Sequence, residues 1–438
     1  MTLSSAALLG ILLLLFFIRK NSHLHLLLLA FSIPYETYAH WDIGFTLKPV
    51  HLFAITTFIS MILNKEKVIP SLKSQLPFLL ILLAAFISLI NAPRNLIFND
   101  FPGSIRTILN LGLLYFIAYV ISISIKDVKA LKGVMYAYAA AVFLSVIIET
   151  VRAHLGGWED VAAVFAADMY QKRGGYMWLP SIVHPFGFLR LSPIIMPPTR
   201  YAAMLMIALT FITTLGIYNQ VKLWKGFRYL LPVLFSVCLF GLTLTFARGS
   251  WISYLAALFI ILFFLKKQEL HKAVSYGGVC LIATTLLLLN IYPKNLDAVF
   301  ERVAPMPVLS AVDASTAIRI SAYKIAFESF KAHPIIGTGW ASNLKPLNVF
   351  LQILCESGLM GLTAFMGFIF YIFFNLYKSI RKLHGEMKLL SIGITAGLIG
   401  TMIYFNTEVV LYEIQHWLII GLGLFVIRFA GKKAAADC

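Results

Sequence analysis

The sequence predicts an all-α, polytopic integral membrane helical bundle. The chain has 438 residues, of which 60% are hydrophobic and only 13% are charged, against about 25% charged residues in an ordinary soluble domain. Its mean hydropathy of +0.85 comes from many separate apolar runs, most of them near the length that crosses a bilayer. Such runs favour α-helices, because each backbone polar group in the hydrocarbon core must be satisfied within its own segment.

The apolar runs predict about 12–13 transmembrane helices, organised as a single transmembrane domain over residues 1–438. Two long connections separate some of them, at 151–199 and 293–346, and the second contains an amphipathic helix over 319–330. The four Cys form no C-x-x-C pair, so we expect neither a disulfide framework nor a zinc site. The runs lie at 3–18, 23–39, 46–63, 76–92, 104–125, 133–150, 200–218, 229–246, 249–265, 273–292, 347–377, 389–405 and 414–430.

The distribution of charge predicts the orientation of the helices. A net charge of +17 would suggest nucleic acid as the partner of a soluble protein, but in a polytopic membrane protein it first indicates cytoplasmic loops. The short loops and the C-terminal tail that alternate onto one side hold 21 of the 36 Lys and Arg and only 5 of the 19 acids. We therefore expect this side to be cytoplasmic, the two long segments to be periplasmic, and no nucleic acid to bind.

The cations on the opposite, outer side are mostly arginines. Arg binds phosphate bidentately and stays protonated, whereas Lys acts as a point charge. A cluster of Arg at the outer boundary is suited to a lipid diphosphate, although single Arg residues also snorkel at helix ends or pair with acids such as Glu301 and Asp313. The outer arginines are Arg94, Arg106, Arg152, Arg173, Arg190, Arg200, Arg248, Arg302 and Arg319.

Arg248 and Arg200 stand at the outer ends of apolar runs, and Arg190 stands in the first long segment. Arg248 lies in Ala247-Arg248-Gly249 between two apolar runs with almost no loop, where a cation is costly unless it faces a polar cavity or a partner. The alternative is a tight turn with an interfacial Arg. Arg190 and Arg200 flank a Pro-rich stretch that fixes an extended or turned path towards the next helix.

Two further side chains are candidates for proton transfer. Glu356 lies well inside an apolar run, so its carboxyl must be paired or protonated; it can serve as a base, as an Arg partner or as a neutral hydrogen-bonding group. His333 precedes Pro334 in a turn and ranks second as a base, since a His in this setting is more often structural. Glu408 and Glu413 are further acids on the outer side.

These pieces together resemble the O-antigen ligase and O-antigen polymerase superfamily of bacterial polytopic membrane glycan transferases. The resemblance lies in Ala247-Arg248-Gly249, in the run from Arg319 through His333-Pro334 to Gly337-Thr338-Gly339, and in Asn348 followed after nine residues by Gly358-Leu359-Met360-Gly361. The stretch from Arg190 to Pro198 is similar to the outer-loop arginine segment of the family. The resemblance covers roughly residues 190–370.

The resemblance implies a glycosyltransferase in the bacterial inner (cytoplasmic) membrane, with its active site on the periplasmic side. Its donor would be an undecaprenyl diphosphate-linked glycan, and its acceptor either a carrier-linked glycan, in a polymerase, or lipid A-core, in a ligase. Arg190, Arg200, Arg248 and Arg319 would bind the diphosphate, and Arg248, Glu356 and His333 are the catalytic candidates. The absence of a D-x-D motif favours a reaction with no metal and no cofactor.

One departure from the ligase pattern favours a polymerase. Ligases carry a His directly before the Asn of the Asn-x9-Gly-x-x-Gly pattern, and this chain has Leu347 there. A polymerase implies membrane lipids and a chain-length regulator protein as further partners. The rival functions are a flippase or exporter for a lipid-linked glycan, which internal repeats would favour and the sequence lacks, and a non-catalytic scaffold.

Overall fold

The computed structural model confirms a helical membrane protein. Within the part of the chain that it describes, eight helices are long and apolar enough to cross a membrane, and four shorter helices are also apolar. These twelve match the predicted runs from 23–39 onwards, and the run 3–18 lies outside the described residues. Two strands of two residues each, β1 (Trp41–Asp42) and β2 (Thr46–Leu47), form a short antiparallel pair. The structure describes residues 22–36, 41–42, 46–64, 72–92, 101–155, 191, 197–219, 227–291, 314–342 and 346–436.

The contacts divide the chain into two compact units, each discontinuous in sequence. The first comprises Met1–Ser60, Lys126–Met306 and Ile392–Gly400, and the second comprises Met61–Ile125, Pro307–Ser391 and Thr401–Cys438.

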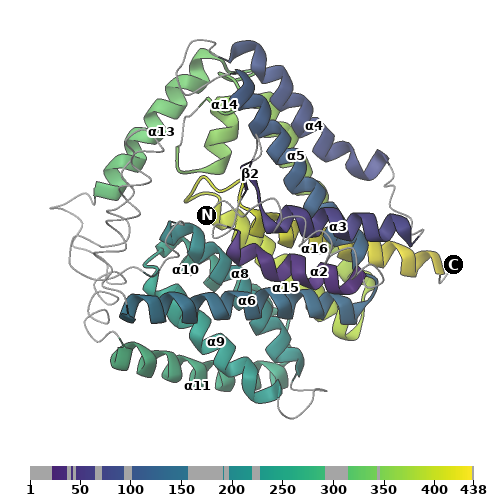
Figure 1. Cartoon of the computed structure of the whole chain (residues 1–438), viewed down its shortest axis with the longest axis vertical. Helices are drawn as coiled ribbons and strands as arrows, with labels where there is room; N and C mark the ends of the chain where they lie inside the picture. Colours follow the sequence, from purple (N-terminus) through teal and green to yellow (C-terminus); the bar gives the residue numbers. More distant parts are fainter. Residues whose placement is uncertain are drawn as a thin grey trace. The chain divides into compact units, whose positions relative to one another are not determined.

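The first unit is built around α8, whose side chains are mostly buried. This helix packs against α6, α9 and α10 (Figure 1), while α2 packs on α6 and α11 on α9. Polar side chains join the apolar faces: the hydroxyls of Ser145 and Tyr201 are 2.9 Å apart, and Tyr138 donates to the carbonyl of Met204. The helices are α2 (Ser22–Ser32), η1 (Ile33–Tyr35), α3 (Pro49–Leu63), α6 (Val128–Leu155), α8 (Pro198–Asn219), α9 (Phe227–Leu244), α10 (Arg248–Phe263) and α11 (Lys267–Ile291).

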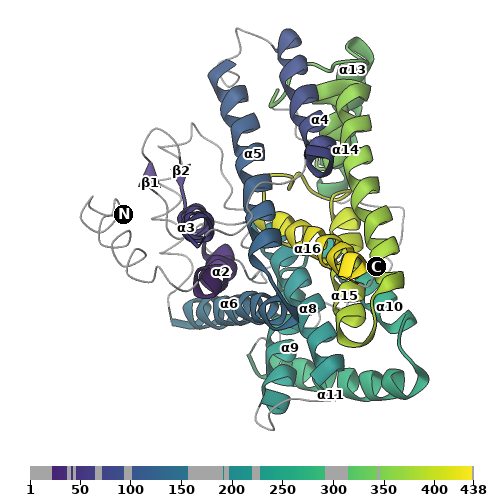
Figure 2. The ribbon, with the colours of Figure 1, turned by 90° about the vertical axis from the view of Figure 1, so that its right-hand side faces the viewer.

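The second unit joins its helices through an aromatic cluster. Phe78 stacks on Tyr115 with ring centroids 3.8 Å apart, and both rings meet the edges of Phe368 and Trp417. These four side chains come from four different helices, and Figure 2 shows two of these helices, α4 and α14, side by side. The helices are α4 (Leu72–Ser88), η2 (Leu89–Asn91), α5 (Phe101–Ser124), α13 (Ala314–Ala332), α14 (Val349–Lys382) and α16 (Ile414–Ala436).

The helix α15 (Gly385–Tyr404) contributes residues to both units. Within the first unit its middle packs closely on α8 and α10. A Cβ at Gly393 would lie 2.1 Å from the hydroxyl of Thr214, and one at Gly400 would lie 2.9 Å from the carbonyl of Ser253. Small residues at helix contacts allow such close approach in membrane proteins.

Candidate functional site

The helix α14 is broken at Gly358, where φ is 65° and ψ is −163°. The break separates a short segment, 349–357, from a long segment, 359–382. The long segment measures about 36 Å at 1.5 Å per residue, which is enough to cross a hydrocarbon core of roughly 30 Å by itself. The apolar run 347–377 placed Glu356 well inside a helix, and α14 occupies this run. The structure adds the break, which puts Glu356 in the short segment, two residues before Gly358.

The turn from His333 to Trp340 satisfies the backbone groups that the break would otherwise leave without partners. The N–H groups of Thr338 and Gly339 donate to the carbonyls of Cys355 and Glu356, at 2.9 and 3.0 Å. On the other side of the break, the N–H groups of Leu359 and Met360 donate to the carbonyls of Pro334 and Ile335, at 2.9 and 3.1 Å. An unpaired backbone group at membrane depth costs several kcal/mol, so this turn is what allows α14 to break.

Glycines are required where the turn meets the broken helix. A Cβ at Gly337 would lie 2.4 Å from the backbone of Glu356, and one at Gly358 would lie 2.3 Å from the carbonyl oxygen of Ile335. Both glycines also have positive φ, at 72° and 65°. Gly337, from the Gly-Thr-Gly piece of the sequence pattern, and Gly358, from the Gly-x-x-Gly piece, are therefore both required by one backbone crossing.

Arg319 anchors the connection between α15 and α16. Its Nη1 donates to the carbonyl of Thr407 at 2.6 Å, and its Nη2 lies 3.4 Å from Oε1 of Glu408. The Arg319 side chain is 29% exposed, so this ion pair is shielded but still reached by solvent. The acids Glu301 and Asp313, considered as partners from the sequence, lie outside the described residues. Glu408 is the carboxylate that pairs with Arg319.

Asn348 connects the same loop to the start of α14. Its Oδ1 accepts from the N–H of Leu351 at 3.0 Å, which makes it the N-cap of the helix, and its Nδ2 donates to the carbonyl of Asn406 at 3.4 Å. The N–H of Val349 donates to the carbonyl of Phe405 at 2.8 Å. The structure thus brings Arg319 and Asn348 together around residues 405–408.

Glu356 is buried, with 2% of its surface exposed. Its Oε1 accepts from Nε2 of Gln352 at 3.2 Å, one helical turn earlier. Tyr412 lies in the connection between α15 and α16. Its burial, and secondly the nearby charge of Glu356, raise the pKa of its phenol well above the usual range. The carboxyl therefore sits among polar side chains rather than in an apolar core.

The second unit holds further buried polar groups that the sequence patterns did not single out. The side chains of Gln415 and His416 have no hydrogen-bond partner among the described residues. The indole N–H of Trp340 lies beside the hydroxyl of Tyr412. Buried polar atoms are normally paired, so Gln415 and His416 indicate a place for water or for a polar ligand. The available signal was Gln415-His416 at the very start of the last apolar run.

His333 lies at the exposed end of the turn. Its Nδ1 is 3.4 Å from Nδ2 of Asn91, which also donates to the carbonyl of Gly337 at 2.9 Å. Among the described residues, the Asn91 amide is the side chain that approaches the His333 ring, and no arginine or carboxylate forms a bond with that ring. The structure therefore fits a role in fixing the turn.

Arg248 begins α10 in the first unit, at a tight turn after α9. Phe246 has a φ of 53°, and the indole N–H of Trp251 donates to the carbonyl of Leu242 at 3.0 Å across this turn. Arg248 itself is exposed. The backbone geometry presents its guanidinium at a helix N-terminus, where the helix dipole also favours an anion.

Arg200 lies in the first turn of α8 and is partly buried. Arg190 falls outside the described residues. The next residue, Leu191, is described, and its N–H donates to the carbonyl of Leu244 at 2.9 Å, four residues before Arg248. Arg200 and Arg248 belong to the first unit, and Arg319, His333 and Glu356 to the second.

In a comparison with curated proteins, none matches the chain. Residues 233–405 match the family model described as O-antigen ligase. The matched segment begins in α9 and ends at Phe405, so it contains Arg248, Arg319, His333 and Glu356, whereas Arg190 and Arg200 precede it. This match over part of the chain supports the superfamily of membrane glycosyltransferases that the motifs resemble.

Proposed function

We propose that this protein transfers a glycan from an undecaprenyl diphosphate carrier to an acceptor sugar on the periplasmic face of a bacterial inner membrane, and that it polymerises lipid-linked repeat units. The observation that carries the proposal is the match of residues 233–405 to the O-antigen ligase family model, a segment that includes an outer-end arginine and the broken helix beside a buried carboxyl. The acceptor is then another carrier-linked glycan, and a chain-length regulator protein is a proposed partner.

In the proposed reaction, a hydroxyl of the acceptor sugar attacks the anomeric carbon of the donor. The bond from that carbon to the diphosphate oxygen breaks, and undecaprenyl diphosphate leaves with the electron pair. Direct displacement inverts the anomeric centre. The leaving group is already good, so the protein has to stabilise the departing charge and orient the acceptor.

Arginines are proposed to stabilise that charge. Guanidinium groups bind diphosphate oxygens bidentately and keep their charge, so they can act in place of a metal ion. Arg248 is the principal candidate, supported by its exposure at the N-terminus of α10, and we assign Arg190, Arg200 and Arg319 to the same ligand. No cofactor is part of the proposal.

Glu356 is proposed as the base that accepts the proton of the acceptor hydroxyl. Support comes from its place in the short segment of α14 and from the buried polar groups of Trp340 and Tyr412 nearby. His333 is the second candidate, and its exposed position beside Asn91 fits that role less well.

A ligase that joins the glycan to lipid A-core is the second candidate function. It is favoured by the matched family model, whose description is O-antigen ligase. Against it stands Leu347, at the place where ligases carry a His. Leu347 has a φ of 52°, directly before the N-cap of α14, so its backbone is held in a conformation that a branched side chain rarely adopts.

The two candidates are separated by their acceptors. Purified protein is incubated with carrier-linked repeat units alone and, in parallel, with these units and lipid A-core, and the products are resolved by size. A ladder of lengthening glycans from the units alone is the expected result. A product that forms only when lipid A-core is present would establish the ligase, and no product in either reaction would contradict glycan transfer.

A further inference from the structure

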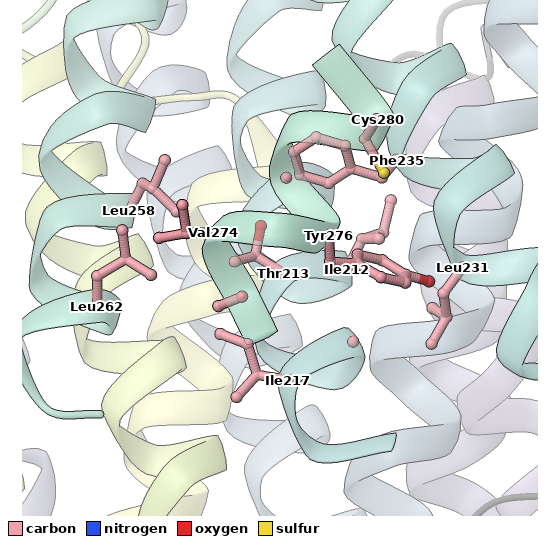
Figure 3. Close-up of a pocket in the computed structure, with 13 residues that line it drawn as sticks. Ile212, Thr213, Ile217, Leu231, Phe235, Leu258, Leu262, Val274, Tyr276 and Cys280 are labelled. Atoms are coloured by element: carbon pink, nitrogen blue, oxygen red, sulfur yellow. The ribbon is translucent and has the colours of Figure 1, made fainter. Parts of the chain in front are cut away.

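An apolar cavity lies within the first unit, between α8, α9, α10 and α11. Its volume is about 160 Å³, close to the roughly 150 Å³ of an apolar cavity that stays dry and binds a small hydrocarbon. Figure 3 shows the side chains of Leu258, Leu262 and Val274 on one side of the cavity and of Leu231 and Phe235 on the other.

The lining of the cavity offers a ligand little polar contact. The hydroxyl of Thr213 is already used, since it donates to the carbonyl of Leu209 at 2.7 Å and lies 3.0 Å from the hydroxyl of Tyr254. The thiol of Cys280 faces the carbonyl of Pro232 at 3.9 Å. A cavity whose polar groups are satisfied internally favours a hydrocarbon over water.

The position of the cavity along the helices indicates which leaflet it faces. Its lining residues on α10 are Leu258 and Leu262, in the last two turns of the helix, and those on α11 begin at Ala273, near the start of the helix. The two helix ends meet at Lys266 and Lys267, the last residue before α11 and its first residue, on the side that the charge distribution predicts to be cytoplasmic. Arg248 lies at the opposite end of α10, so the cavity and the proposed diphosphate ligand occupy opposite leaflets.

Two exposed lysines lie at the level where a lipid headgroup would be. Lys266 and Lys267 precede Ala273 by six or seven residues, about 9–11 Å along a helix. The nearby acid Glu269 is engaged locally, since its Oε2 accepts from the backbone N–H of Lys266 at 3.1 Å. The ammonium groups can therefore attract an anionic headgroup while the cavity takes the chain attached to it.

We propose that this cavity binds one acyl chain of an anionic phospholipid from the cytoplasmic leaflet, with Lys266 and Lys267 attracting its phosphate. The largely apolar lining disfavours a sugar, and the lysine pair favours an anionic over a zwitterionic lipid. The proposal is independent of glycan transfer, because none of these residues belongs to the proposed active site.

Two neighbouring glycines of α11 provide a matched pair of variants. A Cβ at Gly277 or at Gly278 would meet no atom within 4 Å, so both accept a larger side chain. Gly277 lines the cavity, whereas Gly278 is exposed on the outer surface of the helix. Gly277→Phe should fill the cavity, and Gly278→Phe should leave it open.

The test reconstitutes the full chain in vesicles of phosphatidylethanolamine and phosphatidylglycerol that carry a trace of phosphatidylglycerol with a diazirine in one acyl chain. After illumination, crosslinked peptides are mapped by mass spectrometry. We expect labelling of α8–α11 around the cavity in the parent and in Gly278→Phe, and its loss in Gly277→Phe. Replacing Lys266 and Lys267 by Gln should weaken labelling roughly fivefold for each lysine.

Three outcomes would overturn the proposal. These are equal labelling of Gly277→Phe and Gly278→Phe, equal labelling by a phosphatidylcholine probe, or labelling of the cavity by a diazirine undecaprenyl phosphate in place of the phospholipid. If Gly277→Phe does not yield a monodisperse protein, Gly216→Leu on α8 replaces it. Gly216 also lines the cavity and has no atom within 4 Å of an added Cβ.

Discussion

Arg248 and Arg319 illustrate two uses of a guanidinium at the predicted outer side of the membrane. Arg319 is partly engaged within the protein, with one nitrogen on the carbonyl of Thr407 and another near Glu408, and 29% of its side chain stays exposed to a ligand. Arg248 is exposed at the start of α10. The sequence pattern predicted both as diphosphate ligands, because sequence does not reveal which acid, if any, forms an ion pair with each arginine.

Replacement of Arg248 should therefore act on the reaction rather than on folding. We expect Arg248→Ala to reduce the rate of glycan transfer by about 10²–10³-fold, the loss typical of removing one charge-stabilising donor. Arg248→Lys should recover only part of the rate, since Lys cannot bind a diphosphate bidentately. The measurement is the initial rate of product formation with equal amounts of monodisperse protein, and an unchanged rate in Arg248→Ala would exclude the assigned role.

Asn348 should contribute to stability through two separable bonds. Asn348→Ala removes both the N-cap of α14 and the contact with the carbonyl of Asn406, and should lower the free energy of unfolding by about 1 kcal/mol or more.

Asn348→Asp is the matched control, because a carboxylate oxygen can still cap the helix while the donor to Asn406 is lost. Thermal unfolding in detergent should order the three proteins as parent, Asp and Ala, from most to least stable. Equal stability of the Ala variant and the parent would show that the Asn348 cap does not contribute to the free energy of unfolding.

At the scale of elements, the break in α14 is the feature that organises the second unit. The turn 333–340 supplies donors to one side of the break and acceptors to the other. The turn and the broken helix therefore satisfy each other's backbone hydrogen bonds. The sequence showed the Gly-rich pieces but not their pairing, because periodicity reports which residues are apolar and not which backbone groups lack partners.

Gly358→Ala tests this arrangement. The added Cβ would lie 2.3 Å from the carbonyl oxygen of Ile335 and the backbone would keep a positive φ, so we expect a loss of about 1–3 kcal/mol or more in the free energy of unfolding.

Gly367→Ala, in the long segment of the same helix, is its control, since an added Cβ there meets no atom within 4 Å. Gly367→Ala should leave the unfolding temperature unchanged or raise it. If both variants unfold at the same temperature, the close approach at Gly358 is not a constraint on the fold.

At the scale of the whole molecule, the sequence predicted the fold class and the positions of the helices well. Every apolar run from 23–39 onwards coincides with a helix, and the predicted amphipathic helix at 319–330 lies within α13 (Ala314–Ala332). Apolar length and backbone satisfaction are local properties, so they can be read from sequence. The Arg319–Glu408 pair and the approach of Tyr412 to Glu356 each join residues 50 or more positions apart, and sequence cannot supply those distances.

The predicted orientation of the whole chain can be tested by labelling. In a Cys438→Ser background the cysteines Cys238, Cys280 and Cys355 are buried, so a new cysteine dominates the reaction with a membrane-impermeant maleimide. Lys324→Cys should react in intact spheroplasts, since α13 is expected on the periplasmic side, and Lys266→Cys should react only after lysis. The reverse labelling pattern would show that the chain has the opposite orientation in the membrane, and it would remove the basis for a periplasmic site.

The central claim is that the chain couples release of undecaprenyl diphosphate to formation of a glycosidic bond. The most direct measurement quantifies both products over time from carrier-linked repeat units, with the parent protein and Arg248→Ala. We predict that one undecaprenyl diphosphate is released for each bond formed, and that both rates fall together in the variant. Glycan extension without release of the carrier diphosphate, or release that proceeds without any new bond, would contradict the account.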